Sequence, residues 1–255
     1  MIRDIQSATN PFVKHLRALL TSKKARQEDG AFVLEGQRGI QSLIDHDSDI
    51  CSIRQLVISD DWDQPDMLDG FETVRLPRSM FDKLSDVRSA QGILAIVDYR
   101  PTPLFVPKTG NLLLLDNLRD PGNLGTLIRS AVGAGFRAVL LYGDCVEAVN
   151  PKVIRATMGT FAFTEIQPVG DEEIRQLTEA GYELCVTTGT EGENLYQAGF
   201  GNRTILAIGS EAHGISAGLM KLSDRRITIP LHPQCESLNA AVAGSICMFS
   251  IASRP

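Results

Sequence analysis

The stretch NLLLLDNLRDPGNLGTLIR, residues 111–129, joins an apolar run to a polar turn and then to a helical pattern. The four leucines at 112–115 are typical of a strand that is covered on both faces, as in parallel sheets. Pro-Gly at 121–122 predicts a turn, and Asn123 is placed to cap the following helix. Arg129 stands among the apolar residues of that helix. Because arginine is rarely buried without a partner, Arg129 is expected either to reach solvent or to face an anionic group.

Similar apolar runs of strand length recur further along the second half of the chain, separated by helical patterns, at residues 137–142, 183–188 and 204–209. Strands buried on both faces with helices between them indicate an α/β fold with a parallel sheet. The sequence contains neither internal repeats nor low-complexity tracts.

The first hundred residues also alternate between predicted strands and predicted helices. Thr9 or Asn10 is placed to cap a helix with Pro11 in its first turn. We expect strands at 31–36, 54–59 and 92–99 and helices at 37–46 and 80–87. Three prolines and a terminal glycine mark residues 101–110 as a linker. The sequence therefore predicts two domains, 1–100 and 111–255.

The bulk composition is that of an ordinary soluble protein, with 255 residues, 43% hydrophobic and 22% charged. No apolar run approaches the ~20 residues that span a bilayer, so no membrane association is expected. The N-terminus lacks the apolar core of a signal peptide, which predicts a cytoplasmic protein. The five cysteines form no C-x-x-C pair and the four histidines are scattered, so we expect reduced thiols and no metal.

The net charge of -6 conceals one basic segment. Residues 11–26 contain no acidic residue and five basic ones, Lys14, Arg17, Lys23, Lys24 and Arg26. Such a patch attracts phosphates locally even on an acidic protein. The alternative is a solvated helix face, which the residues alone favour.

Two further loops are candidates for a site, because ligands of α/β sheets bind beyond the carboxyl ends of strands. GSEAHGIS (209–216) follows an apolar strand and contains Gly209 and Glu211. It has no phosphate-binding glycine pattern, and its glutamate suits a cation such as Arg129; an ordinary strand-to-helix turn is the alternative. ITIPLHPQCESLNAAVAGSICMF (227–249) ends a strand and opens a small-residue helix, capped by Ser237 or Asn239.

Taken in order, N-L-G-T-L-I-R, I-G-S-E-A-H-G and I-P-L…E-S-L-N resemble the three motifs of the TrmH/SpoU branch of the SPOUT methyltransferases. The resemblance covers most of residues 111–255. The N-x-x-V-K-x-L opening, F-V-L-E-G-Q-R and Q-G-I-L-A resemble that family's small RNA-binding domain, which implies an L30e-like fold.

The resemblance implies an α/β catalytic domain with a deep trefoil knot, a homodimer, and S-adenosylmethionine bound in the knot. The residues that match the cofactor-binding positions are Gly209, Ile229, Leu238, Leu231 and Thr188. The residues that match the family's polar active-site set are Asn123, Arg129, Glu211, Ser237 and Asn239.

The implied reaction is methyl transfer to a ribose 2′-hydroxyl in structured RNA. A neutral guanidinium at pH 7 costs roughly 7.5–9 kcal/mol, so we expect Arg129 to act as a fixed cation, oriented by Glu211, rather than as a base. The basic segment 11–26 then becomes a candidate RNA-binding surface. We expect 23S ribosomal RNA as the substrate, with transfer RNA as the alternative. A non-catalytic RNA-binding protein that retains the fold is the alternative from another class.

Overall fold

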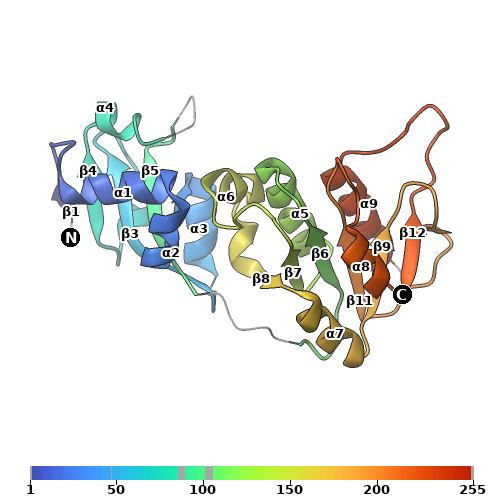
Figure 1. Ribbon diagram of the computed structural model, residues 1–255. Coiled ribbons are helices and arrows are strands. Elements are labelled where there is room, and N and C mark those ends of the chain that lie inside the picture. Colours follow the sequence, from blue (N-terminus) through green and yellow to red (C-terminus); the bar gives the residue numbers. More distant parts are fainter. Residues whose placement is uncertain (1, 47, 86–89, 101–105, 254–255) are drawn as a thin grey trace. The chain divides into compact units, whose positions relative to one another are not determined.

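The computed structural model describes residues 2–46, 48–85, 90–100 and 106–253 (Figure 1). Parts of two predicted segments, 101–105 of the linker and 86–87 of the short helix, lie outside these residues. The chain forms two compact units: Met1–Arg100 with Val149–Ala162, and Pro101–Ala148 with Phe163–Pro255. Residues 149–162, which the sequence assigns to the second domain, thus pack with the first unit.

The first unit contains a five-stranded mixed sheet in the order β1-β4-β3-β5-β2. Strand β5 runs antiparallel to β3 and β2, and the remaining pairs are parallel. The strands are β1 (Ile2–Asp4), β2 (Ala31–Glu35), β3 (Cys51–Ser59), β4 (Thr73–Leu76) and β5 (Ile93–Tyr99). The helices are α1 (Pro11–Thr21), α2 (Lys23–Asp29), α3 (Gln37–Asp45), α4 (Arg78–Phe81) and α6 (Pro151–Thr157), with the 3-10 turns η1 (Pro65–Leu68) and η2 (Thr160–Phe163). The predicted strands and the helix predicted at 37–46 are present. The helix predicted at 80–87 is wrong in its bounds, because α4 ends at Phe81 and residues 82–84 form turns. Strands β1 and β4 were not predicted.

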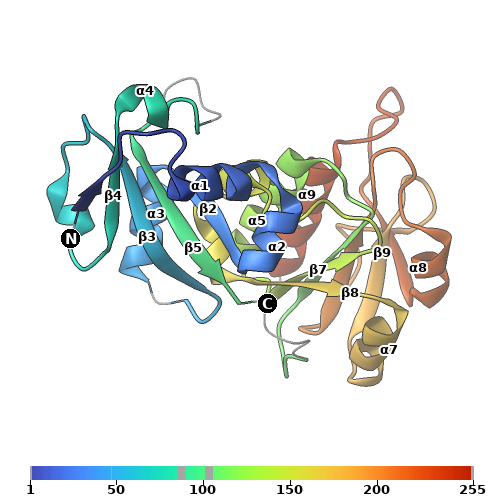
Figure 2. The same cartoon turned by 60° about the vertical axis from the view of Figure 1, so that its left-hand side comes forward.

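Strand β2 buries side chains on both of its faces. Ala31 and Val33 join the core that includes Leu16 of α1, which lies across the sheet in Figure 2. On the other face, the ring of Phe32 packs edge-on against Phe161, with 5.3 Å between ring centroids. Alternating side chains on a strand point to opposite faces, so this edge strand is covered by helices on both sides.

The second unit contains a seven-stranded sheet in the order β10-β12-β9-β11-β6-β7-β8, in which neighbouring strands run parallel. Its strands are β6 (Leu112–Asp116), β7 (Ala138–Tyr142), β8 (Glu165–Val169), β9 (Glu183–Thr187), β10 (Glu193–Asn194), β11 (Thr204–Ile208) and β12 (Arg225–Thr228). Its helices are α5 (Pro121–Gly133), α7 (Asp171–Glu179), α8 (Ala217–Leu222) and α9 (Ala240–Ala252). The predicted parallel α/β sheet is confirmed, with the four leucines of β6 at most 1% exposed.

Helices α5 and α9 pack closely because α9 has small residues at the contact. A side chain on Gly244 would overlap Leu127, and the hydroxyls of Ser130 and Ser245 lie 2.8 Å apart. In the part of the chain that the structure describes, none of the helices has both the length and the apolar content needed to cross a membrane.

Candidate active site

The loops that follow β6 and β11 meet beyond the carboxyl ends of these two strands. The two strands are parallel neighbours with Leu115 beside Ile208, so their carboxyl ends coincide. The helix after β6 is capped by Asp120, whose Oδ1 accepts from the backbone nitrogen of Asn123 at 2.7 Å. The prediction that Asn123 caps this helix is therefore wrong. Because Asp120 occupies that position, the Asn123 side chain is left to reach across the loops.

Asn123, Glu211 and Asn239 form a closed hydrogen-bonded triangle at these strand ends. Nδ2 of Asn123 donates to Oε1 of Glu211 at 2.7 Å, and Nδ2 of Asn239 donates to the same oxygen at 2.6 Å. Asn239 also donates to Oδ1 of Asn123 at 3.0 Å. Three segments that are far apart in the sequence are joined through one carboxylate oxygen, and hydrogen bonds to a charged acceptor are stronger than neutral ones.

Asn239 has a second role as the cap of α9. Its Oδ1 accepts from the backbone nitrogens of Ala241 and Val242 at 2.9 and 3.2 Å. With the oxygen held by the helix, the NH₂ group is the part of the amide that faces Glu211. The sequence-based choice between Ser237 and Asn239 as the cap is thus settled for Asn239, and capping and the site geometry depend on the same side chain.

Asp116, which the sequence analysis did not single out, supports the loop that carries Glu211. It is fully buried, its Oδ2 accepts from the backbone nitrogen of Ser216 at 2.6 Å, and its Oδ1 accepts from the Asn117 side chain at 2.6 Å. The carboxylate therefore ties the end of β6 to the end of the 209–216 loop. The available signal was an acidic residue directly after four leucines.

Beside the triangle lies a cavity of about 190 Å³. All five predicted cofactor residues line it, together with the two predicted catalytic residues Glu211 and Ser237. Lining residues that the sequence analysis did not select are Thr187, Gly189, Ile208, Ser210, Gly214, Glu236, Ala240 and Ala243. Most of these are direct sequence neighbours of predicted residues. The three motifs therefore show where the cavity lies but do not identify all of its lining residues.

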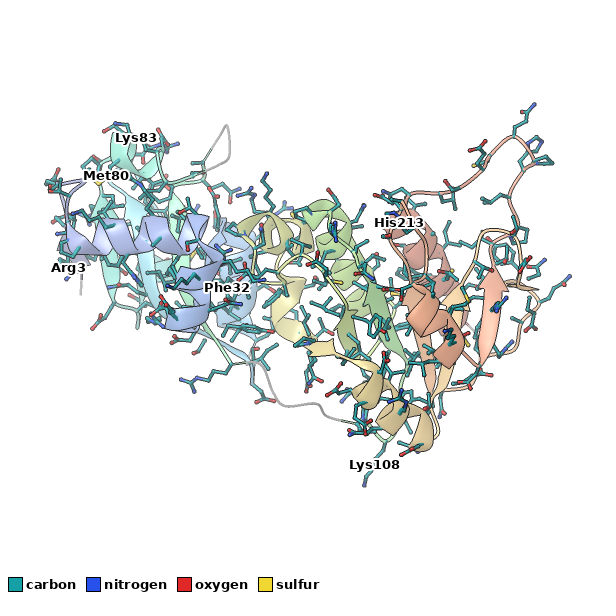
Figure 3. All side chains as sticks on the ribbon, viewed as in Figure 1. Arg3, Phe32, Met80, Lys83, Lys108 and His213 are labelled. Atoms are coloured by element: carbon teal, nitrogen blue, oxygen red, sulfur yellow. The ribbon has the colours of Figure 1, made fainter. Side chains whose placement is uncertain are left out.

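At Gly209, which lines this cavity, two segments of backbone lie very close together. A Cβ atom there would overlap the backbone of Gly214 and Ile215, across the turn that Ser210 and Gly214 close with backbone hydrogen bonds of 2.8 and 3.1 Å. Only glycine allows that approach. His213 of the same loop is exposed (Figure 3).

Arg129 does not join the triangle. Its side chain is exposed and is not among the residues that line the cavity. It makes no ion pair with Glu211, and none of the described residues is its hydrogen-bond or ion-pair partner. The expected orientation of Arg129 by Glu211 is thus corrected, since the glutamate is held by two amides instead. Helix geometry explains the difference: six residues after Asn123, Arg129 lies about 9 Å further along α5 and roughly 120° around it.

The basic segment lies on α1 and α2 of the first unit, where Lys14, Arg17, Lys23 and Lys24 are exposed. Lys24 pairs with Glu28 at 3.6 Å. Arg26 is different: it is only 5% exposed, and its guanidinium donates to the carbonyl of Leu19 at 2.7 Å. The expectation that Arg26 contacts RNA is therefore wrong, because its donors stabilise the junction of the two helices.

The cysteines are free thiols, of which Cys235 is exposed and lies in the loop between the cavity residues Leu231 and Ser237. Burial raises the pKa of Cys185 and of Cys247 to about 12. Within the described residues, no cluster of three or more histidine, cysteine or acidic side chains is arranged to hold a metal ion.

Comparison with known proteins gives two family matches that divide the chain. The SpoU rRNA Methylase family matches residues 110–249, and the MRM3-like substrate binding domain matches residues 10–95. The first match covers the cavity and the triangle, and the second covers α1, α2 and strands β2, β3 and β4 of the mixed sheet.

Relatives match over nearly the whole length. The "23S rRNA (guanosine(2553)-2'-O)-methyltransferase RlmP" of Bacillus subtilis is 28% identical over 252 residues, which cover 98% of this chain and 99% of that protein. The "23S rRNA (guanosine-2'-O-)-methyltransferase RlmB" of Salmonella typhi is 31% identical over 68% of this chain and 75% of its own. The AdoMet-bound rRNA methyltransferase of Sinorhizobium meliloti superposes with a TM-score of 0.87, at 27% identity, over 98% of this chain and 97% of its own. Taken with the convergence of the three sequence motifs on one cavity, these matches place the chain in the SpoU rRNA methylase family.

Proposed function

We propose that this chain is an S-adenosylmethionine-dependent methyltransferase that methylates a ribose 2′-hydroxyl in large-subunit (23S) ribosomal RNA. One observation carries the proposal: the three family motifs meet in space, with Asn123, Glu211 and Asn239 hydrogen-bonded at the edge of a cavity lined by all five matched cofactor residues. Two relatives described above are named as 23S rRNA guanosine 2′-O-methyltransferases, and this supports the choice of substrate.

The cavity suits the proposed methyl donor chemically. Ile229, Leu231 and Leu238 provide apolar walls for an adenine ring, and Gly209 keeps backbone groups within reach of it. Glu211 and Glu236 line the same cavity, and carboxylates attract a sulfonium cation. When bound, S-adenosylmethionine supplies a methyl group that is activated by the positive sulfur.

The protein's own residues then have to position a weak nucleophile, the 2′-hydroxyl, and stabilise the negative charge that develops on its oxygen as its proton passes to solvent water and the methyl group leaves the sulfur. Ser237 lines the cavity, where its hydroxyl can hold the ribose, while Asn239, whose amide is bonded to Glu211 and to the start of α9, positions the loop that carries Ser237. Arg129 grips an RNA phosphate and stabilises negative charge that develops on the 2′-oxygen. With a reference pKa of ~12.5–13.8, the guanidinium stays protonated and does not act as the base.

The proposal includes a homodimer and a trefoil knot in the second unit, as the family resemblance implies. Support for the dimer comes from α9, which is apolar on nearly all sides. One side of α9 packs on α5, while Val242 and Phe249 remain 48% and 51% exposed. Large apolar side chains that recur on one helix face are typical of an interface with another chain. Light scattering coupled to size exclusion tests the oligomeric state.

The test of the function is to map ribose methylation across total RNA from cells with and without the gene. We expect one 23S rRNA position to lose its 2′-O-methyl group, and purified protein with the methyl donor to restore it. Loss confined to a transfer RNA would move the substrate to the alternative class. Calorimetric titration that detects no S-adenosylmethionine binding, with no methylation lost in cells, would favour the non-catalytic RNA-binding alternative.

A further inference from the structure

The first unit has a cavity of about 350 Å³ that is separate from the site described above. It opens where β2 ends and α3 begins, and all of its lining residues belong to the first unit. Neither the methyl-transfer site nor the basic segment on α1 and α2 includes any of these residues.

One wall of this cavity is apolar and another is polar. Leu34 and Ile154 form the apolar wall, and Arg38 and Arg155 provide guanidinium groups. The Arg155 guanidinium lies 3.7 Å from the carboxylate of Glu35, whose side chain is 8% exposed. A nearly buried acid beside it fixes Arg155 in place, so this cation is positioned in advance.

Gln91 adds an oriented donor. Its Oε1 accepts from the backbone nitrogen of Gln37 at 2.9 Å, which leaves Nε2 as the part of the amide available to a ligand. This contact forms where Gly36 takes a φ of +103°, a conformation that few other residues adopt.

Met158 supplies an independent observation. It ends α6 with a φ of +52°, a left-handed conformation that costs energy for any residue with a side chain. Its side chain lines the cavity and yet is 52% exposed. Glycine would be the favoured residue at such a helix end, so the helix end does not account for the long, polarizable, half-exposed side chain that lines the cavity here.

We propose that this cavity takes an unpaired nucleobase of the RNA substrate. Met158 and Leu34 contact the base, Nε2 of Gln91 donates to it, and Arg38 and Arg155 contact the flanking phosphates. A concave, half-apolar pocket suits a base that has left its stack, whereas paired bases present only their edges. The inference rests on the proposed RNA substrate and adds a second point of recognition, distinct from the methylated ribose.

The test uses the full-length protein and ribosomal RNA extracted from cells that lack the gene. Filter binding measures the RNA affinity of two variants, Arg38→Gln and Met158→Gly. Glycine relieves the left-handed strain at 158, so the second variant keeps the fold while it removes the side chain. Lys83→Gln is the matched control: it is exposed in the same unit, removes the same charge as Arg38→Gln, and lies outside the cavity (Figure 3).

We expect Arg38→Gln and Met158→Gly each to weaken RNA binding by about fivefold or more, with S-adenosylmethionine affinity unchanged and Lys83→Gln close to the parent. Benzoylphenylalanine in place of Met158 should crosslink to one unpaired nucleotide, mapped by reverse-transcriptase stops. Variants that bind RNA like Lys83→Gln, or crosslinks spread over paired regions, would overturn the proposal.

The two proposals fail differently. If the parent protein methylates ribosomal RNA while both cavity variants behave like the control, the nucleobase site is wrong and the function stands. If the crosslink and the binding losses appear but no ribose is methylated, the function is wrong and the nucleobase site stands.

Discussion

Nδ2 of Asn239 lies 2.6 Å from Oε1 of Glu211 while Oδ1 of the same amide caps helix α9. Asn239→Asp separates these two roles. Aspartate is as good a cap as asparagine, but its second oxygen would face Glu211 and repel it. We expect stability within about 1 kcal/mol of the parent and methyl transfer at least about tenfold slower, measured by thermal unfolding and single-turnover methylation. Asn239→Ala, which removes both roles, should lower both quantities. Full activity of Asn239→Asp would show that the triangle is not needed.

Asp116 should be a positioning residue for the loop that carries Glu211. In Asp116→Asn, the new NH₂ group must face either the Ser216 nitrogen or the Asn117 side chain, which leaves a buried donor unmatched. We expect the free energy of unfolding in urea to fall by about 1–3 kcal/mol and amide exchange in residues 209–216 to become faster. The matched control is Asp120→Asn, because asparagine caps a helix as well as aspartate does. Equal stability of the two variants would contradict the role of Asp116.

The close backbone approach at Gly209 predicts a selective loss of cofactor binding. A methyl group in Gly209→Ala would overlap the backbone of Gly214 and Ile215, so the turn must open and the cavity must change shape. Calorimetry should detect S-adenosylmethionine binding at least about tenfold weaker. Gly199→Ala, where a Cβ meets nothing within 4 Å, should bind like the parent.

The basic helices predict the salt dependence of RNA binding. Replacing Lys14, Arg17 and Lys23 together by glutamine should reduce the slope of log affinity against log salt by up to ~2–3, since each lost phosphate contact removes about 0.7–0.9. S-adenosylmethionine affinity should not change. Arg26→Gln should leave the slope unchanged and lower stability instead, because its donors bond the Leu19 carbonyl. A reduced slope in Arg26→Gln would restore that residue to the RNA surface.

Thiol reactivity tests the placement of Cys235. Burial raises the pKa of Cys185 and Cys247 to about 12, so at pH 8 roughly one molecule in ten thousand carries the reactive thiolate at either position. We expect one fast thiol, Cys235, in alkylation of the native protein followed by peptide mapping. S-adenosylmethionine should slow that reaction, because Cys235 lies in the loop between the cavity residues Leu231 and Ser237. An alkylation rate of Cys235 that does not change when S-adenosylmethionine is added would show that cofactor binding does not affect this loop.

The sequence predicted the second sheet well because continuous apolar runs such as Leu112–Leu115 carry their own signal. Strands of two to four residues, such as β1 and β10, were missed because alternation cannot be recognised over so few positions. Asp120 and Asn123 are both good caps, and only the three-dimensional contact to Glu211 shows which of them is free.

The predictions for Arg129 and Arg26 were wrong for the same physical reason. Charge complementarity suggested a partner for Arg129 and an RNA role for Arg26, but complementarity says nothing about direction. Arg129 makes no bond to Glu211, since it lies roughly 120° around α5 from Asn123, and Arg26 turns inward to a backbone carbonyl. The five residues predicted to bind the cofactor all line one cavity, since that placement depends on loop positions at strand ends rather than on where a long side chain points.

The pairing of β6 with β11 has a consequence for synthesis on the ribosome. Leu112 has Ile205 as its neighbour, and much of the second unit is translated between them. Until the later strand emerges, one side of β6, with its four leucines, stays without its partner. The nascent chain therefore exposes an unpaired apolar strand for seconds, at elongation rates of about 5–20 residues per second.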